Sequence, residues 1–186
     1  MIKYLMILIL AASAAQSAPT KYELETNGSS VGFIYSLNDA DVRGTMPVLS
    51  ADLALDFDDV RKSRVSVRVD VTRAKAGFVF ATEGIKGPEL LHAAAHPEIT
   101  FTSTAFRQIA SGYAVDGQLT VRGVTKSVTL IGKLHRAEGT EDGDTSRLVV
   151  ALKGAISRKA FGADGYPKFV KDKISLDIRA AMQRAN

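Results

Sequence analysis

Cysteine is absent from the 186 residues of this chain, and that absence excludes several kinds of protein at once. No disulfide can hold the fold together, so its stability has to come from the burial of apolar side chains and from strand pairing. No lipid can be attached through a cysteine, and no cysteine can ligate a metal. With 46% apolar residues, the chain is expected to form one domain with a sizeable core.

Aromatic residues are also few, at 7% of the chain, and the basic residues form no continuous run. The net charge of +4 at pH 7 and the pI near 9.3 favour attraction to anionic surfaces. However, the charges are interspersed along the predicted strands, and neither a basic helix nor an aromatic stacking platform can be identified. The sequence therefore argues against nucleic acid as a partner.

Motifs of catalysis are missing as well. The chain has neither a G-x-S-x-G nucleophile elbow nor a glycine-rich phosphate loop. Its three histidines are His92, His96 and His135, and the first two have the i, i+4 spacing of a zinc site on a helix. Pro97 ends any helix there, however, and no acidic ligand cluster accompanies the pair. We therefore predict that the protein is not an enzyme and holds no metal or cofactor.

The first 17 residues have the composition of a secretory signal peptide. Lys3 is followed by an apolar run over 4–12 and then by small residues, which is the order of n-region, h-region and cleavage region. About a dozen apolar residues fall short of the ~20 that a membrane-spanning helix needs, so no stable membrane anchor is expected. Cleavage after Ser17 or after Ala15 satisfies the small-x-small rule. We predict a signal peptide over 1–17, a mature domain over 18–186 and a periplasmic location.

Alternation of apolar and polar residues dominates the mature chain. In YAVDGQLTVRGVTKSVTL, from Tyr113 to Leu130, two alternating stretches flank a basic turn, and each is typical of a strand with one dry and one wet side. A polar stretch over 37–43 is expected to close the first strand. About eight half-polar strands without a long helix indicate an antiparallel all-β fold, either a two-sheet sandwich or a closed barrel. Further strands are predicted over 31–36, 49–57, 65–71, 99–106, 148–153 and 174–180.

One region, 74–95, is predicted to be helical and to cross one end of the fold. Pro88 follows Gly87 and would occupy the first position of a helix over 88–95, which His96 and Pro97 end. Another short helical turn is expected just before it, over 78–86.

Four segments resemble the YceI-like family, secreted barrels that are related in architecture to lipocalins and associated with long isoprenoid lipids. The segments follow one another in the order that the family pattern expects, and together they cover nearly all of the mature chain. They read KYELETNGSSVGFIYSLNDADVRGTM, LHAAAHPEITFTST, GQLTVRGVTKSVTL and ISRKAFGADG. The resemblance implies an antiparallel lipocalin-like barrel of about eight strands, with a short helical segment over one end.

The resemblance also implies an apolar tunnel that binds a polyisoprenoid chain such as a quinone tail. Such a tail has no hydrogen-bonding groups, so its affinity must come from burial, at roughly 25 cal/mol per Å² of apolar area. For each predicted tunnel residue, packing in the core of a filled barrel is the alternative. The side chains that we assign to the tunnel are Phe33, Tyr35, Phe78, Phe80, Phe101, Tyr113, Leu119, Phe161 and Phe169.

Two polar residues complete the predicted ligand site. His96 lies at a helix-to-strand junction, where its imidazole is expected either to cap backbone groups or to hold a polar headgroup. Arg158 follows Ile156 by two residues and so shares its face, where the guanidinium needs an acceptor. That acceptor is expected to be a buried carboxylate or an oxygen of the ligand. Arg122 and Lys126 flank a tight turn and are expected at an exposed hairpin tip.

The sequence thus predicts a secreted binding or carrier protein that shields the tail of an isoprenoid, a quinone or a similar amphiphilic lipid, under a lid formed by 77–95. Two alternatives stay open. One is a hydrolase or isomerase that acts on a lipid in the same cavity and uses His96 and Arg158. The other is a stress-response or interaction module with a filled core and no ligand. A homodimer is also compatible with the sequence.

Overall fold

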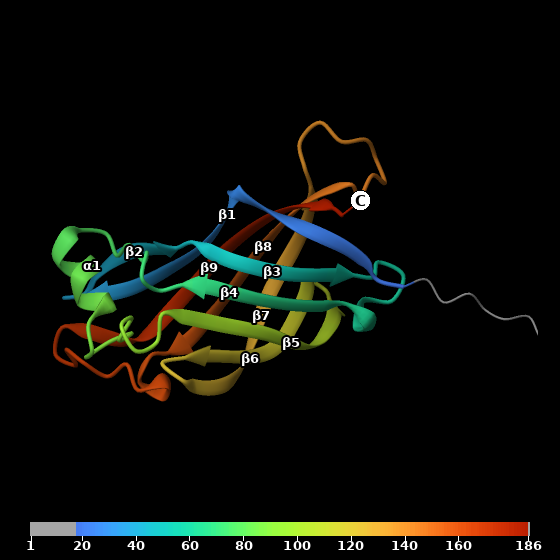
Figure 1. The fold of residues 1–186 in the computed structure, drawn as a ribbon. Helices are drawn as coiled ribbons and strands as arrows, with labels where there is room; N and C mark the ends of the chain where they lie inside the picture. Colours follow the sequence, from blue (N-terminus) through green and yellow to red (C-terminus); the bar gives the residue numbers. More distant parts are fainter. Residues whose placement is uncertain (1–17, 186) are drawn as a thin grey trace, which may run out of the picture.

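The strand β1 (Thr20–Leu37) pairs with the last strand, β9 (Val170–Arg184), and this pairing closes the sheet into an antiparallel barrel (Figure 1). The structure, a computed structural model, describes residues 18–185, so the predicted signal peptide over 1–17 lies outside the described residues. Each of the strands between them pairs with its neighbours in the wall, and the predicted all-β barrel is confirmed. These strands are β2 (Ala40–Met46), β3 (Val48–Leu55), β4 (Arg64–Asp70), β5 (Glu98–Ile109), β6 (Gly112–Val121), β7 (Val124–Arg136) and β8 (Arg147–Ser157).

The strands β2 and β3 share one position in the wall of the barrel. β2 pairs with 31–37 of β1, and β3 pairs with 20–22 of the same strand. Pro47 separates β2 from β3 because proline has no amide hydrogen to give to a ladder. The hairpin between β1 and β2 turns at Asn38 and Asp39, which both have positive φ. The polar stretch predicted over 37–43 is therefore wrong beyond this two-residue turn, since the chain continues at once as a strand.

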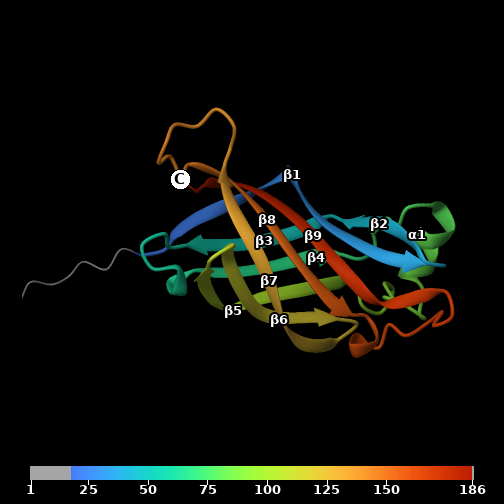
Figure 2. The ribbon, with the colours of Figure 1, turned by 180° about the vertical axis from the view of Figure 1, so that it is seen from behind.

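A bulge bends β1 in the middle of its length (Figure 2). Four residues of β1, 26–29, face only Ala180 of β9, so the regular ladder is interrupted there. The hydroxyl of Ser29 bridges the gap: it accepts a hydrogen bond from the amide of Ala181 at 3.0 Å and donates one to the carbonyl of Glu25 at 2.7 Å. The side chain thus replaces ladder hydrogen bonds that the extra residues remove.

Side chains fill the end of the barrel that lies near the C-terminus, which we call the closed end. Its buried centre is made of Tyr22, Leu53, Leu148 and Met182, with aliphatic residues around it. The hydroxyl of Tyr22 donates to the carbonyl of Thr145 at 2.8 Å, which fastens the 137–146 loop to this end. The 3-10 helix η1 (Val60–Lys62) lies in the β3–β4 connection at the same end (Figure 1).

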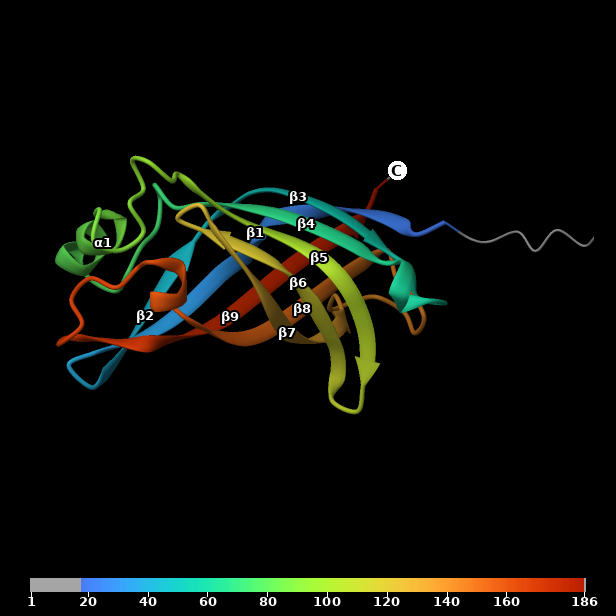
Figure 3. The same ribbon diagram turned by 90° about the horizontal axis from the view of Figure 1, so that it is seen from below.

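The helix α1 (Val79–Lys86) lies at the opposite end, beside the 158–170 segment that contains the 3-10 helix η2 (Lys159–Phe161) (Figure 3). A helical segment over one end is thereby confirmed, but the helix predicted over 88–95 is wrong. His92 takes a positive φ of 51°, which no α-helix accommodates, and residues 87–96 form successive turns. Their amides bond back to α1, as when Leu91 donates to the carbonyl of Ile85 at 3.0 Å. These tertiary contacts outweigh the helix-start preference of Pro88.

Candidate ligand cavity

A cavity of about 410 Å³ opens at the α1 end of the barrel. Its wall is formed by inward-facing residues near the ends of several strands, and its rim by α1 and the 158–170 segment. The strand register explains the wall: Ile174 of β9 pairs with Tyr35 of β1 on one side and with Ile156 of β8 on the other. Residues paired in this way point to the same face of the sheet, so all three side chains face the interior.

Polar groups are few in this cavity, and those of Tyr35 and Arg158 are hydrogen-bonded to backbone carbonyls of the protein. The hydroxyl of Tyr35 donates to the carbonyl of Ala76 at 3.2 Å, and burial raises the pKa of Tyr35 above its ordinary value. Asn38 lies at the exposed turn between β1 and β2, at the edge of the cavity. The interior is therefore suited to a hydrocarbon surface and offers little for a polar group to bind.

Arg158 lines the cavity but uses its guanidinium to hold the neighbouring segment. Only 5% of this residue is exposed, and its desolvation lowers the pKa of the guanidinium. The Nε atom donates to the carbonyl of Lys171 at 3.0 Å and Nη2 to that of Val170 at 2.7 Å, while Nη1 donates to the carbonyls of Gly165, at 2.8 Å, and of Ala163. The acceptors are thus backbone carbonyls, where a carboxylate or a ligand oxygen was expected. Arg158 fixes the 163–171 segment that forms part of the rim.

Seven of the eleven residues predicted for the ligand site come together around this cavity. They come from β1, from α1 and the residue before it, and from the segment that connects β8 to β9. They are Phe33, Tyr35, Phe78, Phe80, Arg158, Phe161 and Phe169.

The other four predicted residues do not line the cavity. Phe101 and Leu119 are register partners that pack in the barrel wall, two residues beyond the cavity-lining pair of Ile99 and Val121. Tyr113 faces a separate pocket of about 70 Å³ toward the closed end, beside Phe57 and Leu134. His96 lies outside the cavity as well, and its imidazole packs edge-on against His92 with 5.8 Å between the ring centroids.

Arg122 has a structural role that the sequence did not predict. It lies in the β6–β7 turn, and its Nη1 atom donates to the carbonyls of Pro88, at 2.7 Å, and of Leu90. Arg122 thus lies at the hairpin tip as expected, but it is half-buried and its guanidinium is bound, whereas Lys126 is exposed. Through Arg122 the turn holds the 87–96 segment, which carries the cavity residues Leu90 and Leu91.

Further residues of the cavity, most of them aliphatic, were not predicted from the sequence. Several are strand residues that share a face with predicted ones, so alternation alone would have found them. Tyr166, Ala163, Ile85 and Leu91 lie in the helix or in irregular segments, where no periodic signal exists. The missed strand residues are Leu37, Ile99, Val121, Ile156, Val170 and Ile174.

Within the described part of the chain, residues 18–185, no group of three or more His, Cys, Asp or Glu side chains is placed to hold a metal ion. In the same residues no helix has the length and apolar character needed to cross a membrane.

Fold and cavity together define a class of protein: an antiparallel barrel with its first and last strands paired, filled at one end and hollow under a helical segment at the other. The chain belongs to the YceI-like domain family, whose sequence pattern matches residues 22–182. The resemblance noted in the sequence is thereby confirmed.

Relatives and solved structures agree with this assignment. The UPF0312 protein of Serratia proteamaculans is 28% identical over 156 residues, which cover 83% of this chain and 81% of that protein. Protein YceI of Escherichia coli is 27% identical over 155 residues, with coverage of 83% and 81%. The crystal structure of BcnA from Burkholderia cenocepacia has a TM-score of 0.75 at 19% identity, covering 86% of this chain and 99% of that one.

One further structure is described by what it binds. It is a polyisoprenoid binding domain from Saccharophagus degradans, implicated in plant cell wall breakdown, with a TM-score of 0.60 at 11% identity. It covers 89% of this chain and 99% of that domain. The TM-scores of these two structures show a shared fold, and at such identities the likeness shows the fold alone.

Proposed function

We propose that this protein binds one apolar chain-like lipid, such as an isoprenoid or the tail of a quinone, in the cavity at the α1 end and carries it through water. The observation that supports this proposal is an open cavity of about 410 Å³ whose walls are almost wholly apolar. Its volume falls in the range of small-molecule sites, roughly 300–1,000 Å³. Because Tyr35 and Arg158 already bind backbone carbonyls, binding energy would come from burial, at roughly 25 cal/mol per Å².

The family adds support of a coarser kind. A solved neighbour with the same fold is a polyisoprenoid binding domain. An isoprenoid tail has the shape and the lack of polarity that this cavity accepts, so we extend that ligand class to the present chain. The headgroup would then lie at the rim, near the exposed Asn38.

Binding is favoured over catalysis by where the polar residues lie. A lipid-modifying enzyme that used His96 and Arg158 would need both side chains at the cavity, but His96 lies outside it. Arg158 lines the cavity with its donors engaged by four carbonyls. A filled-core module is disfavoured by the cavity itself.

The first test is to express the full chain in a bacterial host, purify the secreted protein without detergent, and analyse an organic extract by mass spectrometry. We expect an apolar lipid in roughly equimolar amount, whose mass identifies the chain length and the headgroup. An empty extract, together with no thermal shift on addition of quinones or polyprenols, would contradict the proposal. The same preparation, examined by N-terminal sequencing, tests the proposed cleavage near residue 17 and export to the periplasm.

A cavity-filling variant separates binding in the cavity from binding elsewhere. Ile156→Trp places an indole ring in the cavity, whereas Ala155→Trp places the same ring on the exposed outer face of the same strand. We expect the first variant to lose the lipid and the second to retain it, as measured by extraction and by fluorescence of the apolar dye N-phenylnaphthylamine. Equal binding by the two variants would move the site away from the cavity. Sedimentation of both proteins would also test the homodimer.

A further inference from the structure

The rim of the cavity carries most of the exposed large apolar side chains of residues 18–185. Eight such side chains are at least 40% exposed, and five of them lie on the rim, in two clusters. One cluster is at the start of α1, and the other is in the segment between β8 and β9. The five are Phe78 (49%), Val79 (75%), Phe80 (86%), Tyr166 (47%) and Phe169 (54%).

Their exposure and their position point to contact with something outside the molecule. Water-exposed apolar clusters of this kind are unfavourable unless they are covered. The four aromatic members also line the cavity, so the exposed surface is continuous with the apolar interior. The two clusters lie on separate segments at the mouth, which suits insertion into a soft surface better than packing on a flat protein face. Aromatic side chains are favoured at the interface of a bilayer.

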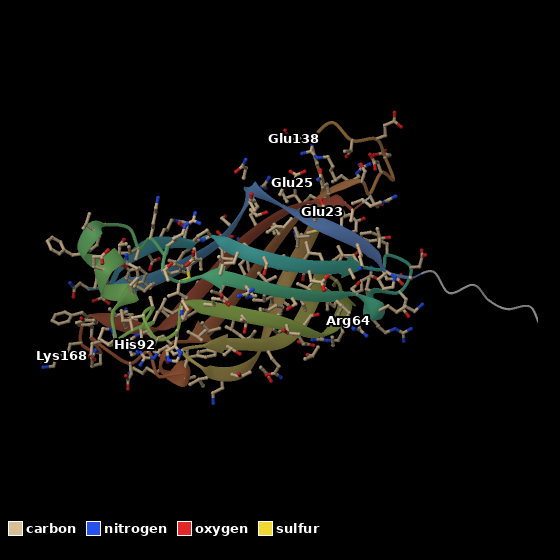
Figure 4. All side chains as sticks on the ribbon, in the orientation of Figure 1. Glu23, Glu25, Arg64, His92, Glu138 and Lys168 are labelled. Atoms are coloured by element: carbon tan, nitrogen blue, oxygen red, sulfur yellow. The ribbon has the colours of Figure 1, made fainter. Side chains whose placement is uncertain are left out.

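The charges near the mouth favour an anionic surface. The segments that carry the apolar clusters are both basic: 73–86 has three basic residues and one acidic, and 158–171 has four basic residues and one acidic. Lys168 lies between Tyr166 and Phe169 and extends away from the barrel (Figure 4). The acidic turn at Asp39 partly offsets this charge, because its carboxylate pairs with Lys171 at 2.6 Å.

One acidic loop lies on the opposite part of the molecule. The 137–146 loop, fastened to the closed end, has four acidic residues and no basic one. Figure 4 shows Glu138 there, with Glu23 and Glu25 also far from the mouth. The closed end also carries basic residues, among them Arg61 and Lys62 of η1, and Arg136 pairs with Asp142 of the loop. The exposed apolar clusters, together with the basic segments that carry them, are therefore what orients the mouth toward an anionic surface.

We propose that the rim docks reversibly on the surface of an anionic phospholipid bilayer, with Phe78, Val79, Phe80, Tyr166 and Phe169 inserted among the headgroups and Lys168 beside the lipid phosphates. Docking seals the mouth against the membrane, so an apolar chain passes between bilayer and cavity without crossing water. The docking is independent of any bound lipid, whereas the transfer step rests on the proposed function.

The absence of tryptophan from the chain makes the test direct. Phe80→Trp places one fluorescent reporter on the rim, and Phe57→Trp is the matched control, an aromatic replacement at a 40% exposed position near the closed end. With vesicles of phosphatidylcholine and phosphatidylglycerol, we expect a blue shift for Trp at position 80, and its quenching by brominated acyl chains, but neither for Trp at position 57. Equal responses, or none, would overturn docking. A blue shift of Trp at position 80 that grows with protein concentration in the absence of vesicles would contradict bilayer docking. It would indicate that a second copy of the chain covers the rim.

Charge and insertion are separated by two further variants of the full chain. Val79 is on the rim but does not line the cavity, and an aspartate in the first turn of a helix is favourable, so Val79→Asp is expected to fold and to bind N-phenylnaphthylamine normally. Its sedimentation with the anionic vesicles should fall at least about tenfold, whereas Ile131→Asp, on the exposed wall of β7, should leave it unchanged. Lys168→Glu should weaken vesicle binding about tenfold at low salt and less at high salt. If Val79→Asp sediments like the parent protein, docking is refuted; if the parent docks but binds no dye, the proposed function fails alone.

Discussion

The ring of Phe33 lies directly against the backbone of Gly44, its register partner on β2. A Cβ atom on Gly44 would stand 2.1 Å from Cζ of Phe33 and 2.6 Å from the carbonyl oxygen of Lys75. The absence of a side chain at Gly44 thus lets a large aromatic ring lie flat against the wall and leaves the cavity open in front of it.

Replacement of Gly44 by alanine is therefore expected to destabilise the protein by about 1–3 kcal/mol, because the new methyl group overlaps both the ring and a fixed backbone oxygen. The displaced Phe33 ring would also intrude on the cavity and weaken binding of N-phenylnaphthylamine. Urea denaturation and a dye titration measure the two effects. Unchanged stability would show that the wall yields more easily than this packing indicates.

Gly84→Ala, in contrast to Gly44→Ala, is expected to stabilise the protein. Gly84 lies within α1, and a Cβ atom there meets nothing within 4 Å. Because alanine favours a helix over glycine, the substitution should raise the free energy of unfolding by roughly 0.5–1 kcal/mol. A thermal melt compared with that of Gly44→Ala checks the contrast, and a loss of stability at both positions would contradict it.

Arg158→Lys should loosen the rim. A single ammonium group cannot replace a guanidinium that serves four carbonyls, and the carbonyls left without a donor should lower the free energy of unfolding by about 2–3 kcal/mol. Hydrogen exchange of the amides over 163–171 should accelerate more than exchange at the closed end. Lys159→Met, at the exposed neighbouring position, serves as the control and should change neither quantity appreciably. Uniform acceleration throughout the barrel would argue against a local role.

The carboxylate of Asp172 should contribute to the acid limb of the stability curve. It accepts hydrogen bonds from the amide of Lys159 and the hydroxyl of Ser157, and these bonds hold the pKa of Asp172 below its ordinary value. The unfolded chain then binds the proton more tightly, so this stabilisation is present above about pH 4 and is lost as the pH falls toward the lower folded pKa. Asp172→Asn should show a smaller loss over that window in denaturation at successive pH values. The outward-facing Asp177→Asn variant should keep the loss.

At alkaline pH, Tyr35 is expected to make the free energy of unfolding fall as the pH rises. Burial raises the pKa of its hydroxyl, so above about pH 10 the unfolded state ionises while the folded state retains the proton. The free energy of unfolding should therefore fall as the pH rises from about 10 toward the higher folded pKa. Tyr35→Phe should lack this component, whereas Tyr113→Phe, which retains Tyr35, should show it. Identical alkaline slopes for the two variants would exclude Tyr35 as the cause.

Strand alternation predicted which residues face the interior but not how deep along the barrel they lie. Tyr113 and Val121 share the inner face of β6, yet eight steps of ~3.3 Å along the strand separate them, so one lies toward the closed end and the other at the cavity. Depth is fixed by register with neighbouring strands, and the alternation pattern does not contain that information. The same limit explains why Phe101 and Leu119 were assigned to the cavity.

Irregular segments escaped prediction for a different reason. The helix preference at Pro88 is local, whereas the turns over 87–96 are set by Arg122 and by amides that bond back to α1. The inward direction of Arg158 was predicted from its spacing to Ile156, but its partners were not, because the carbonyls of 163–171 belong to a segment without a periodic pattern. Among the aromatic residues of irregular segments that line the cavity, Phe78 and Phe169 were predicted but Tyr166 was not.

Pairing of β1 with β9 also determines when, during synthesis of the chain, the barrel can close. The ribosome releases β1 first among the described strands and β9 last, so the wall cannot close before nearly the whole chain has been made. Until then the facing edges of β1 and β8 have no partner, and any product truncated before residue 170 keeps both edges open to association with other chains. The complete chain, including β9, is thus required before the wall closes and these two edges are paired.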